Sequence, residues 1–151
     1  MKNVEIFIGT FHDVKSMRAG TLPISVSRTD PGWFHANAGA KHVYKNMHGV
    51  FCGVKFQQFM PKTTARCRGF EKCKFKDPNT CDYLKEYSEQ LNGLNFEDVI
   101  QALNDLAAIR FCDQIVLVFW ERSDNECSPK TAIIKWFRDH GVEIHEFVPQ
   151  K

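Results

Sequence analysis

The chain has 151 residues, 43% hydrophobic and 25% charged, with a formal net charge of +2 at pH 7. This length suits one domain, residues 1–151, with a single core, and the small net charge gives no argument for nucleic-acid binding by the whole surface. No apolar run approaches the roughly 20 residues of a membrane span, and Glu5 interrupts the apolar start that a signal peptide would need. We therefore expect a cytoplasmic protein with no membrane partner.

The N-terminal part of the chain predicts two strands followed by a loop. Residues 4–11 are mostly apolar, and residues 22–28 alternate apolar with polar side chains, as strands do. Asp, Pro, Gly and Asn mark residues 29–40 as a loop, in which the large side chain of Trp33 needs a partner. Residues 41–60 are irregular or contain one short strand.

Residues 61–81 differ from the rest of the chain in composition, because cysteines and basic residues are concentrated there. Cysteines inside a cell are typically thiols, metal ligands or core residues, since the cytosol keeps them reduced. Four of them could bind zinc or an iron-sulfur cluster, with His48 as a replacement ligand: Cys52, Cys67, Cys73 and Cys81. Against a metal site, the insert lacks the Cys-x2-Cys pair that most such sites contain, so the thiols could equally be unligated.

The same insert also suggests a nucleic-acid surface. Its basic side chains are interleaved with Phe70 and Phe75, a composition that suits a phosphate backbone and its bases. The candidate binding residues are Arg66, Arg68, Lys72 and Lys74. The alternative is an ordinary solvated surface, which is the commoner role of a charge run.

The C-terminal half predicts two helices, a buried strand, a third helix and a last strand. The helices cover residues 82–92 and 95–109, and Asn95 caps the second. The apolar run 115–120 is continuous, which is typical of a central strand buried on both faces of a parallel sheet. Ser128 can cap the third helix, with Pro129 in its first position; Gly141 ends that helix, and residues 142–148 alternate as a strand.

This order of elements indicates an α/β fold. We expect a small Rossmann-like three-layer sandwich with a mostly parallel sheet, carrying the irregular, basic, Cys-rich insert at about residues 61–81. Open α/β sheets bind ligands outside the carboxyl ends of their strands, so the loops after residues 28 and 120 are the places to look for a site.

Four residues gather at this predicted edge. Arg28 ends a strand and has the planar, bidentate guanidinium that suits a phosphate or carboxylate. Trp33 could stack on a base or anchor the loop, and Glu121 could act as general base or pair with a neighbouring arginine. Cys127 precedes the predicted helix cap Ser128, where the helix end favours thiolate, although it could equally be a half-buried loop residue. Together they suggest a pocket for a small anionic, nucleotide-like ligand.

The arrangement of these residues resembles the DUF488 proteins, small bacterial and phage α/β domains. The resemblance runs from about residue 22 to 147 and is carried by the second strand through Arg28, by Trp33, and by the run from Leu117 to Glu121 with a cysteine soon after. In that family the loop after the central strand usually reads Cys-His-Arg, which places Cys127 at the thiol. Here Ser128 and Pro129 replace the His and Arg, and Phe119 replaces another usual cysteine. The resemblance implies the fold more than an activity.

Two classes of function follow. The first is an enzyme acting on a nucleotide, nucleoside or nucleic acid. Its binding residues would be Arg28, Trp33 and Ser128, and its catalytic residues Glu121 and Cys127. The second is a non-catalytic module that binds nucleic acid through the insert, or a phage-encoded protein that sequesters a nucleotide with Arg28 and Trp33. The missing His and Arg after Cys127 favour the second class.

Overall fold

The computed structural model describes residues 4–18, 20–27, 53–60, 62, 82–119 and 129–148. Its described strands form one sheet in the order β3-β2-β4-β1-β5, and every neighbouring pair is parallel. The strands are β1 (Glu5–Thr10), β2 (Thr21–Ser25), β3 (Val54–Lys55), β4 (Gln114–Phe119) and β5 (His145–Glu146). The predicted α/β fold is therefore confirmed, with a sheet that is parallel throughout these residues.

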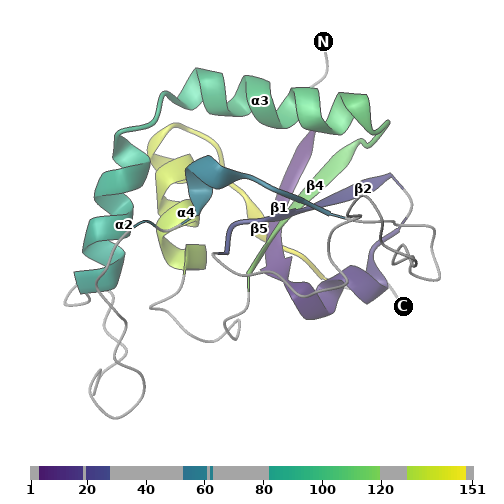
Figure 1. The fold of residues 1–151 in the computed structure, drawn as a ribbon, viewed down its shortest axis with the longest axis horizontal. Helices are drawn as coiled ribbons and strands as arrows, with labels where there is room; N and C mark the ends of the chain where they lie inside the picture. Colours follow the sequence, from purple (N-terminus) through teal and green to yellow (C-terminus); the bar gives the residue numbers. More distant parts are fainter. Residues whose placement is uncertain are drawn as a thin grey trace, which may run out of the picture.

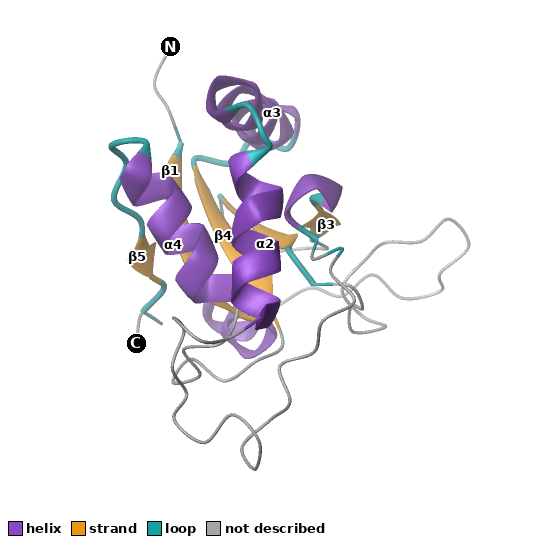
Figure 2. Cartoon of the chain, turned by 90° about the vertical axis from the view of Figure 1, so that its left-hand side faces the viewer, coloured by secondary structure: helices purple, strands orange, loops and turns teal. Residues whose placement is uncertain are grey.

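Helices cover both faces of the sheet. Three α-helices pack on one face: α2 (Asp82–Asn92), α3 (Phe96–Ile109) and α4 (Pro129–Asp139). Figure 1 shows α3 lying across one end of the domain, and Figure 2 shows α2 and α4 side by side in front of the sheet. A short 3-10 helix, η1 (Phe11–Ser16), packs on the other face. A second, η2 (Gln57–Phe59), follows β3. None of the helices in the described part of the chain is long and apolar enough to cross a membrane.

The position of β4 inside the sheet explains why its sequence is continuously apolar. All of its residues are buried, because both faces of the strand are covered. Ile115, Leu117 and Phe119 join the core beneath the α-helices, whereas Val116 and Val118 join the cluster beneath η1. A strand with one solvated face would instead alternate apolar with polar side chains.

Pro23 lies within β2, an inner strand of the sheet, without breaking it. Val26 N–H donates to the Val118 carbonyl of β4, while the Ser25 carbonyl accepts from Phe56 N–H on the β3 side. Successive residues of a parallel strand face opposite neighbours, so Pro23 shares the β3 side with Ser25. The described pairing with β3 begins only at Ile24, so the missing N–H of proline breaks no hydrogen bond of this pairing.

Most predicted helix ends are confirmed, while the bounds of β1, β2 and β5 differ from expectation. β2 covers Thr21–Ser25, so it ends three residues before Arg28, which was predicted to end it. The Asn95 side chain accepts from Asp98 N–H at 3.0 Å, which caps α3 as predicted, and α4 begins at Pro129. β1 ends one residue earlier than predicted, where the chain turns into η1. β5 is shorter than the predicted strand over residues 142–148, because only His145 and Glu146 pair with β1.

Candidate functional site at the carboxyl edge of the sheet

At β2 and β4, which are neighbours in the sheet, the chain continues from the two strands toward opposite sides of the sheet. From β2 the chain goes outward to β3, at one side of the sheet, whereas from β4 it goes through α4 to β5, at the other side. β2 and β4 are direct neighbours, with Ser25 opposite Val118. Connections that diverge in this way leave a crevice outside the carboxyl ends of the two strands, which is where open α/β sheets bind ligands.

The predicted site residues follow these two strand ends in the chain but lie outside the described residues. The described chain continues after β2 as far as Ser27, one residue before Arg28, and after α3 as far as Phe119 at the end of β4, two residues before Glu121. The residues concerned are Arg28, Trp33, Glu121, Cys127 and Ser128. The parallel pairing of β2 and β4 brings the carboxyl ends of both strands to one edge of the sheet.

The exit from β2 is shaped by one buried serine. Ser25 is fully buried, and its Oγ accepts a hydrogen bond from Ser27 N–H at 3.2 Å. A serine side chain that bonds the backbone two residues ahead stabilises a turn, so this bond directs the chain just before Arg28. The alternation of residues 22–28 indicated a polar side chain at position 25 but not its burial or its hydrogen bond.

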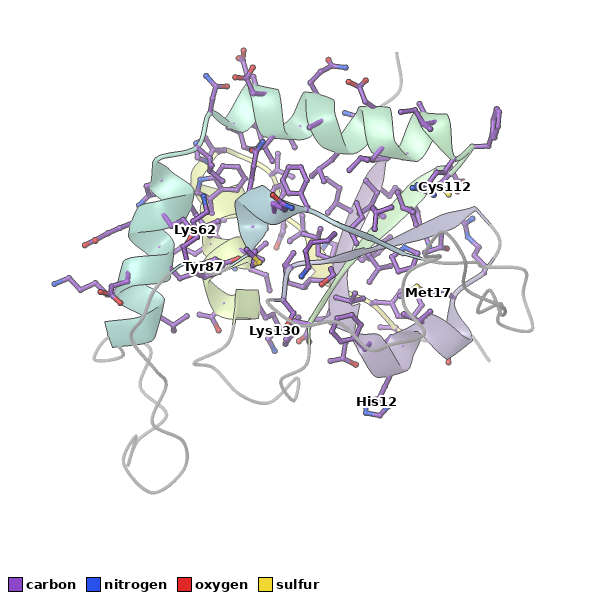
Figure 3. The ribbon with its side chains drawn as sticks, viewed as in Figure 1. His12, Met17, Lys62, Tyr87, Cys112 and Lys130 are labelled. Atoms are coloured by element: carbon purple, nitrogen blue, oxygen red, sulfur yellow. The ribbon has the colours of Figure 1, made fainter. Side chains whose placement is uncertain are left out.

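At the same edge of the sheet, the end of β1 is hydrogen-bonded to the carboxylate of Asp13. Asp13 Oδ2 accepts hydrogen bonds from Thr10 N–H at 2.8 Å and from the Thr10 hydroxyl at 3.3 Å. A Cβ at Gly9 would lie only 2.7 Å from the same Asp13 oxygen, so the backbone approaches this carboxylate closely because residue 9 is glycine. The neighbouring His12 is exposed and extends from η1 away from the sheet (Figure 3).

The sequence carried a signal for this feature. A threonine followed three residues later by an acidic residue is the spacing of a capping box at a helix start. Asp13 is an acceptor that a ligand hydroxyl or amine could share at the end of β1, which is the neighbour of β4 on the side away from β2.

A lysine joins the first turn of α4 to the end of β5. Lys130 Nζ lies 2.6 Å from Glu146 Oε1, and the lysine side chain is only 16% exposed while that of Glu146 is 54% exposed. A cation in the first turn of a helix opposes the helix dipole, so the carboxylate of Glu146 compensates for the position of Lys130. No local sequence pattern indicates this pair, because its members come from different elements that only the fold brings together.

The proposed metal ligands and nucleic-acid contacts also lie outside the described residues: Cys52, Cys67, Cys73, Cys81, His48, Arg66, Arg68, Lys72 and Lys74. Within the described ranges, no group of three or more His, Cys, Asp or Glu side chains is placed to hold a metal ion.

Cys112, which the structure does describe, is not an activated thiol. It lies at the opposite edge of the sheet, just before β4, and is half-buried. Desolvation by burial, followed by the nearby Asp113 carboxylate, raises the pKa of the Cys112 thiol. A raised pKa keeps the thiol protonated, which is the opposite of what a nucleophile or metal ligand requires.

Comparison of the chain with protein-family models, with curated proteins and with solved structures gives no significant match. The class of molecule is therefore defined by its fold, an α/β domain with a parallel sheet. The DUF488 resemblance stays a prediction.

Proposed function

We propose that the protein is an enzyme that binds a small anionic, nucleotide-like ligand outside the carboxyl ends of β2 and β4. The observation that carries the proposal is the divergence of the chain at these two neighbouring strands. In the proposed pocket Arg28 holds the anionic group, Trp33 stacks on a base, and Ser128 donates a hydrogen bond. Glu121 acts as acid or base, and Cys127 acts as nucleophile.

Chain connectivity supports the assignment. Ser25 and Val118 lie opposite each other, so the two strands leave the sheet at the same level. Consecutive Cα atoms are about 3.8 Å apart, so Arg28 begins one step beyond Ser27 and Glu121 two steps beyond Phe119. A guanidinium and a carboxylate that start from neighbouring strand ends can both reach one ligand. α4 begins at Pro129, so Ser128 and Cys127 directly precede the helix start, where a thiolate is favoured.

Binding assays with nucleotides test the proposed role of Arg28 in ligand binding. Thermal shift and calorimetry with nucleoside mono-, di- and triphosphates are expected to reveal binding that Arg28→Ala weakens about tenfold or more, since a bidentate charge-assisted contact is lost. Arg110→Ala is the matched control, because Arg110 is exposed at the opposite edge of the sheet, just before β4. Equal affinities for both variants and the native protein would rule out the pocket.

Measurements of turnover test the proposed catalytic roles of Glu121 and Cys127. Cys127→Ala and Glu121→Gln are expected to abolish activity on a bound nucleotide while its affinity and the melting temperature stay within error. If both variants turn over normally, the catalytic roles are wrong even where the binding site is right.

A second candidate is a binding protein without catalysis, and the start of α4 favours it. Pro129 occupies the first position of the helix, where the DUF488 proteins usually have an arginine, and proline offers neither charge nor hydrogen-bond donor. In this case the basic insert binds nucleic acid, and affinity should fall steeply with salt. Neutralising Arg66, Arg68 and Lys72 should remove that salt dependence, and no binding at low salt would exclude this candidate.

A further inference from the structure

A groove of about 730 Å³ runs along the outer seam between α2 and α4. The two helices lie side by side and begin at the same end of the domain (Figures 1 and 2). The groove is lined from α2 by Leu84, Lys85 and Ser88 and from α4 by Lys130, Thr131, Ala132, Ile134, Lys135, Arg138 and Asp139. The groove lies between two helices on one face of the sheet, and its lining begins at Lys130 in the first turn of α4.

The floor of the groove is apolar. Leu84 and Ala132 are 4% and 5% exposed and belong to the main core, and Ile134 is a half-buried residue packed against it. Ala132 is small, so a third helix can approach the seam closely, in the way that helices nest against one another in bundles. Because Leu84 and Ala132 are already almost fully buried, the apolar surface that a partner can still cover comes mainly from the half-buried Ile134.

The rims of the groove carry positive charge. On α4, Lys135 is paired with Asp139 at 2.8 Å, and Lys130 with Glu146. Lys85 on α2 and Arg138 on α4 have no ion-pair partner among the described residues. Within the described part of the chain, one cation without an ion-pair partner therefore lies on each side of the apolar floor.

These features select among anionic partners. A nucleic-acid backbone would use the cations but not the apolar floor, and the described residues that line the groove include no aromatic side chain for base stacking. An acidic amphipathic helix supplies apolar side chains for the floor and carboxylates for both rims. We propose that the α2–α4 groove docks an acidic amphipathic helix of a partner protein.

The groove is long enough for such a contact. The stretch of α4 from Lys130 to Arg138 spans about 12 Å at 1.5 Å per residue, which corresponds to about two turns of a docked helix. The partner would present apolar residues at positions i, i+3, i+4 and i+7, with glutamates flanking that stripe on both sides.

The probe is a fluorescein-labelled synthetic peptide of about 18 residues with this pattern of leucine and glutamate, titrated with the full-length protein and followed by anisotropy. The control peptide has the same composition with its leucines scattered, and we expect it to bind at least tenfold more weakly. Lys85→Glu combined with Arg138→Glu should lower affinity for the patterned peptide at least tenfold. Ile134→Asn should lower it about fivefold or more through the floor alone.

A matched double variant distinguishes the effect of the groove residues on affinity from the effect of a changed net charge. Lys62→Glu combined with Arg110→Glu changes the same charge at two exposed residues outside the groove, and affinity should stay within about twofold. Circular dichroism and melting temperature establish that each variant is folded. Equal binding of the two peptides, or equal losses in the two double variants, would overturn the proposal. Tighter, Lys85- and Arg138-dependent binding of a labelled oligothymidine would overturn it in favour of nucleic acid.

Discussion

The ends of α3 and α4 provide an internal test of backbone strain, because the same turn is built with different residues. After α3, Phe111 N–H donates to the Ala108 carbonyl and Cys112 N–H to the Ala107 carbonyl. After α4, Gly141 and Val142 make the equivalent pair of bonds to Arg138 and Phe137. This Schellman motif requires a left-handed residue, which is normally glycine.

Phe111 occupies that position in the first turn with φ of +56°, and its side chain is 94% exposed. Gly141 occupies it in the second turn with φ of +81°. A left-handed conformation costs a non-glycine residue roughly 1–2 kcal/mol, and the phenylalanine ring recovers little of this by burial.

Phe111→Gly is therefore expected to stabilise the protein. Relief of strain is partly offset by about 0.5–1 kcal/mol for the greater freedom of glycine in the unfolded chain, which leaves a net gain of roughly 0–1.5 kcal/mol with a midpoint of about 0.75 kcal/mol. Urea unfolding measures this gain, and the midpoint of thermal unfolding should rise by roughly 1–4 °C for a chain of this size.

Two further variants make the test specific. Phe111→Ala keeps the strained backbone and should change stability by less than about 0.5 kcal/mol, as surface substitutions do. Gly141→Ala introduces the strain at the second turn and should cost about 1 kcal/mol or more. Destabilisation by both Phe111 variants would refute the reasoning, because it would mean that the ring packs against the folded protein.

Further predictions concern a buried hydrogen bond, a thiol and the insert. The Tyr87 hydroxyl donates to the Phe59 carbonyl in the core, so Tyr87→Phe should lower the free energy of unfolding by about 1–3 kcal/mol; an unchanged urea midpoint would contradict this. Burial raises the pKa of the Cys112 thiol, so alkylation followed by peptide mass spectrometry should show its rate rising at higher pH than for free cysteine. A rise at the same pH would contradict the burial. The metal hypothesis predicts near-stoichiometric zinc or iron in protein purified without chelator, and its loss in Cys73→Ser; metal-free native protein would return the insert cysteines to ordinary thiols.

Local signals were enough to locate most helices and the central strand. Asn95 marks the start of α3 and Pro129 the start of α4, because capping and proline preferences depend on residues within one turn. The continuous apolar run of β4 likewise indicated a strand covered on both faces, which follows from the solvation of single side chains. The candidate edge was predicted by the same reasoning, since strand-to-helix loops of α/β proteins gather at one end of the sheet.

The order of the strands, and everything that depends on it, was decided by tertiary structure. Glu5 pairs with Gln114 across most of the chain, and no local pattern in either segment specifies such a partner. The divergence between β2 and β4, the Lys130–Glu146 pair and the groove between α2 and α4 all arise from this arrangement. Hydrophobic periodicity and capping residues depend on which side chains of a segment face solvent and on hydrogen bonds within one turn. The pairing of strands depends instead on which segments, far apart in the sequence, bury their apolar surfaces against each other.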